Sequence, residues 1–259
     1  MFARAIVRDV PNTIGAGITT ADLGQPDAEK AREQHRSYRA ALEDCGVEVV
    51  ELDPDDRYPD SVFVEDTAVV TDRCAIITNP GAPERRGEVG EVETVLRDLY
   101  GDVERIMAPG TLDGGDVLQV GDHFYIGLSA RTNGEGAEQL SVILRGYGFG
   151  VAALVELRRF LHLKTGVAYL GGNDIVVAGE LVERDEFRGF DRIVAPADEE
   201  YGANCIRVND RVLVAEDYET VGRGIAERGY EVATLEMSEF RKLNGGLSCL
   251  SLRLPEPRS

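Results

Sequence analysis

Alternating apolar and polar positions divide much of the chain into short paired strands. Four segments show a period of two residues on either side of a turn near positions 72, 121, 172 and 209. Such alternation around a polar or glycine-containing turn is typical of β-hairpins. The predicted hairpins span residues 66–78, 116–128, 165–179 and 204–216.

Segments with helical periodicity lie between the hairpins. Their apolar residues recur every three to four positions, and each segment leads into a short apolar strand. The predicted helices are 84–100, 132–148 and 217–230, and the strands that follow include 103–109 and 230–236. The N-terminal region has a similar order, with a strand at 5–10, a helix at 27–46 and a strand at 47–53.

The recurring unit is therefore a hairpin, a helix and a strand, with a period of roughly 40 to 50 residues. About five such units fill the chain, which favours an α/β fold of five ββαβ blades closed into a propeller around a central channel. The C-terminal strand GLSCLSLRL would pair with the first strand, with Cys249 on one face of its alternation. An open α/β sheet is the alternative, but no strand is followed by a G-x-G-x-x-G motif.

Length and composition limit the class of protein. We expect residues 1–259 to form one domain, because this length suffices for a well-buried core. Neither a signal-peptide pattern nor a long apolar run is present, so a cytoplasmic protein is expected. The four cysteines are far apart without a C-x-x-C pair, and three histidines accompany them, so neither a structural zinc site nor another cofactor is expected.

The charge balance bears on possible partners. The chain has 47 acidic and 28 basic residues and a net charge of −19. Phosphate contacts need clustered cationic side chains, so we expect no nucleic-acid partner, and no membrane partner either. An acidic surface serves solubility first, and it also attracts small cations. We expect a monomer or homodimer that binds a small cationic substrate.

Reactive side chains recur near the start of the predicted hairpins. Asp66, Asp113, His162 and Cys249 occupy nearly the same place in their repeats. Equivalent strand ends of a ring converge on its centre, so these four residues would become neighbours. Cysteine with histidine forms a nucleophile and proton carrier. Two carboxylates can hold a planar cation such as guanidinium through charge-assisted hydrogen bonds.

Each of these residues also has an ordinary structural explanation. A single cysteine in a strand usually belongs to the core, an isolated histidine is often only hydrogen bonded, and aspartate beside glycine usually forms a turn. The shared position of four reactive residues favours a site over these separate explanations.

The chain resembles the dimethylarginine dimethylaminohydrolases nearly end to end. The motifs that carry the resemblance are PDSVFVEDTAVV (59–70), ERRGE (84–88), TLDGGDVLQVGDHFYIGLSARTN (111–133), HLKTG (162–166), GANCIRVN (202–209) and NGGLSCLSLR (244–253). This family is part of the pentein, or guanidino-group modifying, superfamily. The resemblance therefore implies a single catalytic domain built as a five-bladed ββαβ propeller.

The resemblance also implies a reaction. Dimethylarginine or monomethylarginine would be hydrolysed to citrulline and dimethylamine or methylamine. Cys249 would attack the guanidinium carbon to form a covalent thiouronium intermediate, and His162 would protonate the leaving amine and then activate water. Asp66 and Asp113 would hold the guanidinium nitrogens, although Asp113 has a shorter side chain than the Glu of some bacterial relatives.

A further set of residues is implied to bind the rest of the substrate. Arg85 and Arg131 would bind its carboxylate, Asp60 with the backbone at Ile18 its α-amino group, and Phe63 with Leu243 its alkyl chain, while Glu65 would flank the pocket. Residues 11–27, which are rich in Gly and Thr, would form a lid loop or, more simply, an exposed connection.

Two alternatives remain within the same fold. An arginine deiminase would release ammonia, but those enzymes are typically longer and carry an added helical insertion. A non-catalytic pentein-fold binding protein would need no Cys249 and His162 pair. Neighbouring carboxylates raise the pKa of a thiol and a bound guanidinium lowers it, so we expect Cys249 to ionise only when substrate binds.

Overall fold

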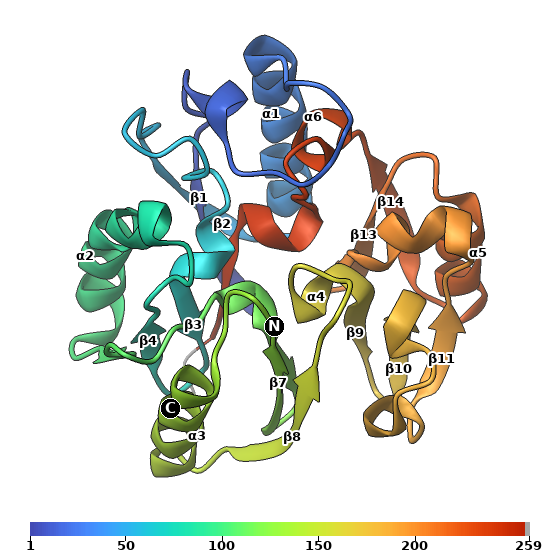
Figure 1. Ribbon diagram of the computed structural model, residues 1–259. Coiled ribbons are helices and arrows are strands. Elements are labelled where there is room, and N and C mark those ends of the chain that lie inside the picture. The colour runs from blue at the N-terminus through green and yellow to red at the C-terminus, as the bar shows by residue number, and fades with distance from the viewer. Residues whose placement is uncertain (257–259) are drawn as a thin grey trace.

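A computed structural model describes residues 1–256, which form five three-stranded sheets arranged in a ring (Figure 1). The last three residues of the predicted domain, 257–259, lie outside the described range. In the blades that follow one another along the chain, the first strand runs antiparallel to the second and the second parallel to the third. This order is the predicted ββαβ propeller.

Four blades are continuous in sequence. They contain β3 (Ala68–Val70), β4 (Ala75–Ile77) and β5 (Glu104–Arg105); β6 (Val117–Val120), β7 (His123–Leu128) and β8 (Gly150–Glu156); β9 (Val167–Gly171), β10 (Asp174–Val177) and β11 (Asp191–Val194); and β12 (Ile206–Val208), β13 (Arg211–Ala215) and β14 (Glu231–Leu235).

The fifth blade joins the two ends of the chain. It contains β1 (Phe2–Arg8), β2 (Glu48–Leu52) and β15 (Leu252–Pro255). β15 runs antiparallel to β1, with Ile6 opposite Leu252, and β1 runs parallel to β2. The C-terminal strand therefore closes the ring, as the sequence predicts.

Helices connect the second and third strands of four blades. These are α1 (Ala28–Asp44), α2 (Val89–Tyr100), α3 (Gly134–Gly146) and α5 (Glu219–Glu227), while α4 (Leu163–Gly166) and α6 (Ser238–Arg241) are single turns. The predicted helix 84–100 is wrong in its first part, which is a 3-10 helix, Pro83–Glu88, ahead of α2. Gly87 lowers the α-helical propensity of this segment.

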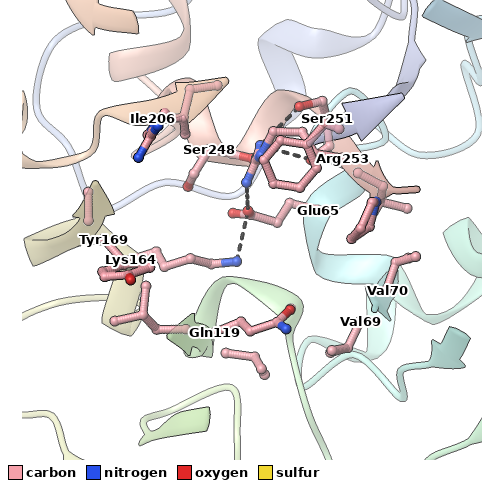
Figure 2. Close-up of a pocket in the computed structure, with 18 of the residues that line it drawn as sticks. Glu65, Val69, Val70, Gln119, Lys164, Tyr169, Ile206, Ser248, Ser251 and Arg253 are labelled. Carbon is pink, nitrogen blue, oxygen red and sulfur yellow. Dashed lines mark hydrogen bonds and ion pairs between the residues drawn. The ribbon is translucent and has the colours of Figure 1, made fainter. Parts of the chain in front are cut away.

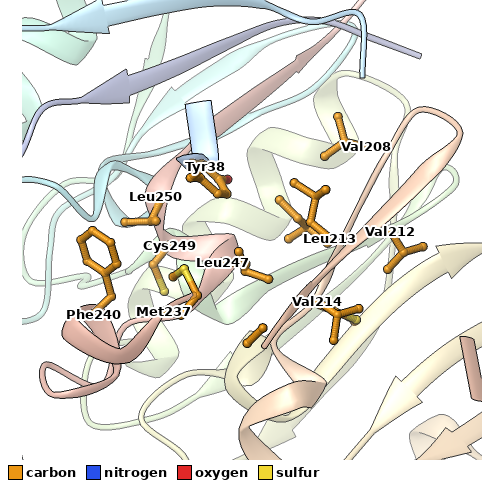
Figure 3. Close-up of a cluster of buried hydrophobic side chains, with 14 of the residues drawn as sticks. Tyr38, Val208, Val212, Leu213, Val214, Met237, Phe240, Leu247, Cys249 and Leu250 are labelled. Carbon is orange, nitrogen blue, oxygen red and sulfur yellow. The ribbon is translucent and has the colours of Figure 1, made fainter. Parts of the chain in front are cut away.

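The inward face of α1 anchors the C-terminal part of the chain. Ala31, Tyr38 and Leu42 are buried on that face at helical spacing. They belong to a core that also includes Phe240 and Leu250 (Figure 3). The Tyr38 and Ser251 hydroxyls lie 2.7 Å apart within hydrogen-bonding distance. This packing holds the segment that carries Cys249 against the rest of the ring.

No helix within residues 1–256 is both long and apolar enough to span a bilayer.

Candidate active site

The reactive residues lie on, or directly before, short helices that precede the first strands of their blades. Asp66 is the third residue of the 3-10 helix Val64–Thr67, and Cys249 is the third residue of Leu247–Leu250. Asp113 and His162 stand directly before Gly114–Asp116 and α4. The predicted single shared position is therefore wrong, because two positions in the repeat supply the four residues.

Cys249 lies on a helical turn, so the strand predicted for it is wrong. β15 begins only at Leu252. The Cys249 N–H donates to the Gly246 carbonyl at 3.1 Å, and the Gly246 N–H donates to Sγ of Cys249 at 3.4 Å. A period-two pattern of apolar residues does not reveal a single helical turn inserted before a strand.

Nine of the predicted residues line one narrow cavity of about 20 Å³. They are Cys249, His162, Asp66, Ile18, Asp60, Phe63, Arg85, Arg131 and Leu243. Leu161, Asn244 and Gly245 line it as well and were not among the predicted site residues. The predicted residues come from segments far apart in sequence and meet around this cavity.

Asp113 contacts the catalytic candidate His162 and does not line the cavity. Its Oδ2 lies 3.0 Å from Nε2 of His162, and its Oδ1 accepts a hydrogen bond from the Gly81 N–H at 2.8 Å. Nη1 of Arg131 lies 3.8 Å from the same Oδ2. The Asp113 carboxylate thus contacts the imidazole, and its contact to a guanidinium stays a prediction.

Asp66 does line the cavity, and its carboxylate is held from two sides. Oδ2 accepts a hydrogen bond from Nη1 of Arg85 at 2.6 Å, and Oδ1 accepts one from the Gly115 N–H at 3.0 Å. Burial alone would raise the pKa of Asp66, but His162 and Arg85 outweigh it and lower that pKa to about 2. Asp66 is thus a fixed negative charge at physiological pH.

His162 is cationic in this environment. Burial disfavours the imidazolium, but the carboxylates of Asp66, Asp113 and Asp116 outweigh burial and raise the pKa of His162 to about 9. A histidine with such a pKa carries its proton at pH 7 and can act as a general acid.

Asp116 is a further supporting residue that was not among the predicted site residues. It is fully buried. Its Oδ1 accepts a hydrogen bond from the Leu163 N–H at 2.9 Å, and its Oδ2 accepts one from the Ser129 hydroxyl at 2.6 Å. These bonds hold the residue next to His162. The second aspartate of the LDGGD motif is the signal that identifies it.

The Cys249 thiol is poorly ionised in the free protein. Burial, Glu65 and Asp66, in this order, raise the pKa of Cys249 to about 12. The direction agrees with the expectation that carboxylates near the thiol keep it protonated until a cation binds.

Arg85 and Arg131 differ in how many hydrogen bonds they make to other residues of the protein. Arg85 is buried and donates to Asp66, to Glu88 and to the Phe63 carbonyl. Nη1 of Arg131 is buried but has no hydrogen-bond partner among residues 1–256. Arg131 therefore has more capacity to bind an anionic group in the cavity.

Asp60 and the loop that contains Ile18 form another side of the cavity. The Ile18 N–H donates to the Asp60 carboxylate at 3.0 Å. Farther along the loop, the Thr20 N–H donates to Oδ1 of Asn244 at 2.9 Å, and the Thr19 hydroxyl donates to the Lys242 carbonyl at 2.7 Å. These bonds hold residues 18–20 across the cavity.

The structure places Glu65 in a different cavity from Asp66. This second cavity of about 980 Å³ is lined by Glu65, Lys164, Ser248 and Arg253, among others (Figure 2). Nζ of Lys164 and Nη2 of Arg253 both donate to Oε1 of Glu65, at 2.8 and 3.0 Å. Adjacent residues thus face different cavities, since Asp66 and Cys249 line the narrow one while Glu65 and Ser248 line the wide one.

Ligand atoms of Asp66, Asp113 and His162 lie within 4.8 Å of one another, a spacing that a metal ion could bridge. The proton that His162 carries competes with such binding, because only a neutral imidazole is a metal ligand.

Comparison with known proteins shows the family. A family model described as N,N dimethylarginine dimethylhydrolase, eukaryotic, matches residues 20–210. An N(G),N(G)-dimethylarginine dimethylaminohydrolase of Pseudomonas aeruginosa is 50% identical over 98% of this chain and 100% of its own length. A protein of that name from Streptomyces coelicolor is 39% identical over 98% of this chain and 97% of its own.

Solved structures agree with the sequence comparison. The P. aeruginosa enzyme in complex with citrulline has a TM-score of 0.96 and 49% identity, and covers 98% of this chain and 100% of that one. The N-terminal domain of ArgZ, an arginine dihydrolase from cyanobacteria, has a TM-score of 0.87 at 21% identity over 99% of both chains, which shows the fold alone.

The fold is that of the penteins. The class of protein that this fold and the relatives define is a hydrolase acting on C–N bonds of linear amidines. Within that class, the chain belongs to the dimethylarginine dimethylaminohydrolase family.

Proposed function

We propose that this protein hydrolyses Nω-methylated L-arginines, both dimethylarginine and monomethylarginine, to L-citrulline and dimethylamine or methylamine. The main support in the structure is the placement of Cys249, a cationic His162 and the Asp66 carboxylate around one enclosed cavity. The names of two relatives that align with nearly the whole chain support the same substrate class.

The cavity offers a partner for each end of an arginine-like ligand. Arg131 would bind the α-carboxylate with Nη1, which has no hydrogen-bond partner among residues 1–256, assisted by the remaining N–H of Arg85. Asp60 and the carbonyl of the loop at Ile18 would accept from the α-ammonium group. Phe63 and Leu243 would pack along the alkyl chain, and Asp66 would hold the guanidinium beside Cys249.

Binding of the guanidinium would ionise the nucleophile. The cation brings positive charge next to a thiol whose pKa is raised by burial and by the negative charges of Glu65 and Asp66. His162 already carries a proton, so the proton of Cys249 leaves to solvent. The resulting thiolate lies next to an electrophilic carbon.

The reaction then takes two stages. The Cys249 thiolate forms a C–S bond to the guanidinium carbon, and the bond from that carbon to the methylated nitrogen breaks as His162 gives this nitrogen its proton. The amine departs and leaves a thiouronium intermediate. Neutral His162 next takes one proton from water, and the water oxygen bonds to the same carbon. The C–S bond then breaks, and the remaining hydroxyl proton passes to solvent, which gives citrulline and the Cys249 thiolate.

Access to the site would require movement of the loop. A cavity of about 20 Å³ has room for little more than one water molecule. Ile18 is partly exposed at its rim, and the bonds of Thr19 and Thr20 to the Asn244 region hold the loop in place. We infer that residues 11–27 open to admit the substrate and close over it.

The direct test is a citrulline assay with asymmetric dimethylarginine, monomethylarginine and arginine in parallel. We expect the methylated substrates to be turned over with a higher kcat/KM than arginine, and Cys249→Ser to be inactive on all of them. Comparable kcat/KM on arginine would instead identify an arginine deiminase. A lack of citrulline from all three substrates would favour a non-catalytic pentein.

The intermediate needs a separate test. Mass spectrometry of His162→Gly protein mixed with S-methyl-L-thiocitrulline, whose thiolate leaving group departs without a general acid, should show a covalent adduct on Cys249, because the hydrolytic water lacks its proton acceptor. We further propose that residues 1–259 act as one catalytic domain and that the protein is cytoplasmic, which the four free thiols of the described chain support.

A further inference from the structure

A second group of potential metal ligands lies where α1 crosses the blade of β1 and β2. Asp9 directly follows β1, Glu51 lies on β2, and His35 lies on the inward face of α1. Because β1 and β2 are parallel, with Arg8 opposite Leu52, Asp9 and Glu51 come to the same end of the sheet. One ligand atom from each of the three residues lies within 4.8 Å of the other two.

His35 is unusual because it is a buried polar group without a protein partner. Its side chain is 0% exposed, and no group within residues 1–256 hydrogen bonds to either ring nitrogen. Its Nδ1 lies 3.8 Å from Oδ1 of Asp9, which is too long for a hydrogen bond. Buried polar groups of this kind call for a bound water or ion.

A metal binds the lone pair of a neutral imidazole, and the complete burial of His35 disfavours the charged form of its ring. The centroids of the His35 and Phe240 rings lie 6.5 Å apart, and Nδ1 of His35 faces Oδ1 of Asp9.

The two carboxylates open the site to solvent. The Asp9 and Glu51 side chains are 37% and 34% exposed. Arg39 pairs with Oε1 of Glu51, so the second oxygen of this carboxylate remains available. The Arg39 charge opposes cation binding, while the two carboxylates and the net charge of −19 favour it.

We propose that Asp9, His35 and Glu51 bind a divalent transition-metal ion such as Zn²⁺, with water in the remaining positions. One imidazole nitrogen and two carboxylate oxygens are suitable ligands for Zn²⁺ at roughly 2.0–2.2 Å. The side chains would contract around the ion by about 1 Å or less to reach such distances. The sequence contains no motif of closely spaced cysteines or histidines that would predict this site, because its ligands come from three separate segments.

The ion would also stabilise the start of the loop of residues 11–27, which contributes to the active-site cavity. Asp9 stands just before residues 11–27, and Ile18 of that loop lines the catalytic cavity. A metal at Asp9 would tie this end of the loop to α1 and β2.

Calorimetric titration with Zn²⁺ tests the site in the Cys249→Ser protein, which lacks the active-site thiol. We compare Glu51→Gln and Asp9→Asn with Glu48→Gln, which is a matched control because Glu48 also lies on β2 and pairs with an arginine. Glu51→Gln and Asp9→Asn should each weaken one Zn²⁺ site at least about tenfold, while Glu48→Gln should not. Equal affinity and stoichiometry in all these proteins would overturn the proposal.

A spectroscopic readout separates this site from the Asp66, Asp113 and His162 group. The chain has three histidines, so ¹⁵N-histidine labelling gives few ring-nitrogen signals. Zn²⁺ should shift Nδ1 of His35, and Mg²⁺ at the same concentration should not, because it avoids imidazole. An unchanged His35 ring, or an equal response to both ions, would mean that only an ordered water or an acidic surface is present.

Discussion

Nε2 of His162 lies 3.0 Å from Oδ2 of Asp113, and both side chains are buried. This pair gives the imidazole its orientation and helps the neighbouring carboxylates to keep it cationic. The histidine that we propose as the general acid therefore contacts a residue that does not itself line the cavity.

Asp113→Asn should lower the pKa of His162, since it removes one of the negative charges that stabilise the imidazolium. The alkaline limb of the kcat profile should move to lower pH, and turnover should fall by about 10²–10⁴. Measurements of kcat against pH and NMR titration of His162 check both effects. Asp98→Asn, on α2, is the control, and an unchanged His162 titration in Asp113→Asn would contradict the assignment.

The Cys249 thiol should be alkylated slowly at neutral pH in the free protein. Its pKa is raised, so the thiolate fraction is small at pH 7 and grows as the pH rises toward the folded-state pKa. The rate of iodoacetamide inactivation should therefore still increase above about pH 9. A rate that levels off with a midpoint near pH 6 would indicate a resting thiolate and imidazolium pair instead.

Glu65→Gln should make the thiol more reactive although Glu65 faces the wide cavity. The substitution removes a negative charge that raises the pKa of Cys249, while the amide oxygen of the glutamine can still accept from Lys164 and Arg253. Each unit by which the pKa falls increases the thiolate fraction about tenfold. Alkylation rates at pH 8 measure the effect, with Glu93→Gln on α2 as the control, and equal rates would exclude electrostatic coupling between the cavities.

Gly115→Ala should damage catalysis through a direct steric effect. An added Cβ would lie 2.7 Å from Nδ1 of His162 and 2.9 Å from Oδ1 of Asp66, so both side chains would have to move. A displacement of about 1 Å in such a site costs roughly 10²-fold in rate. Gly134→Ala is the matched control, because its Cβ would meet no atom within 4 Å. Circular dichroism should show both proteins folded, and equal kcat values would contradict the prediction.

Several features of the fold follow from local sequence patterns. Alternation around short turns predicts the hairpins of β6 with β7 and of β12 with β13, and helical periodicity predicts α3 and α5. The repeated order of these elements predicts the ring and the pairing of β15 with β1. These patterns are readable because each blade buries one face of its strands and one face of its helix.

Only the tertiary structure decided how the candidate residues are arranged. The one-turn helices that carry Asp66 and Cys249 are too short to leave a periodic signal. Neighbouring residues face different cavities: Asp66 and Cys249 line the narrow cavity, whereas Glu65 and Ser248 line the wide one. Similarly, His35 occupies an ordinary inward position of α1, and only the meeting of β1 and β2 places Asp9 and Glu51 beside it.

The sequence by itself therefore determined the kinds of reactive groups and the repeat that brings them to one centre. The tertiary structure decided which of them meet, which charges they carry and which cavity they face. The physical reason is that strand and helix periodicity depends on neighbouring residues, whereas burial, ion pairing and the pKa of a side chain depend on groups that are distant in sequence and close in space.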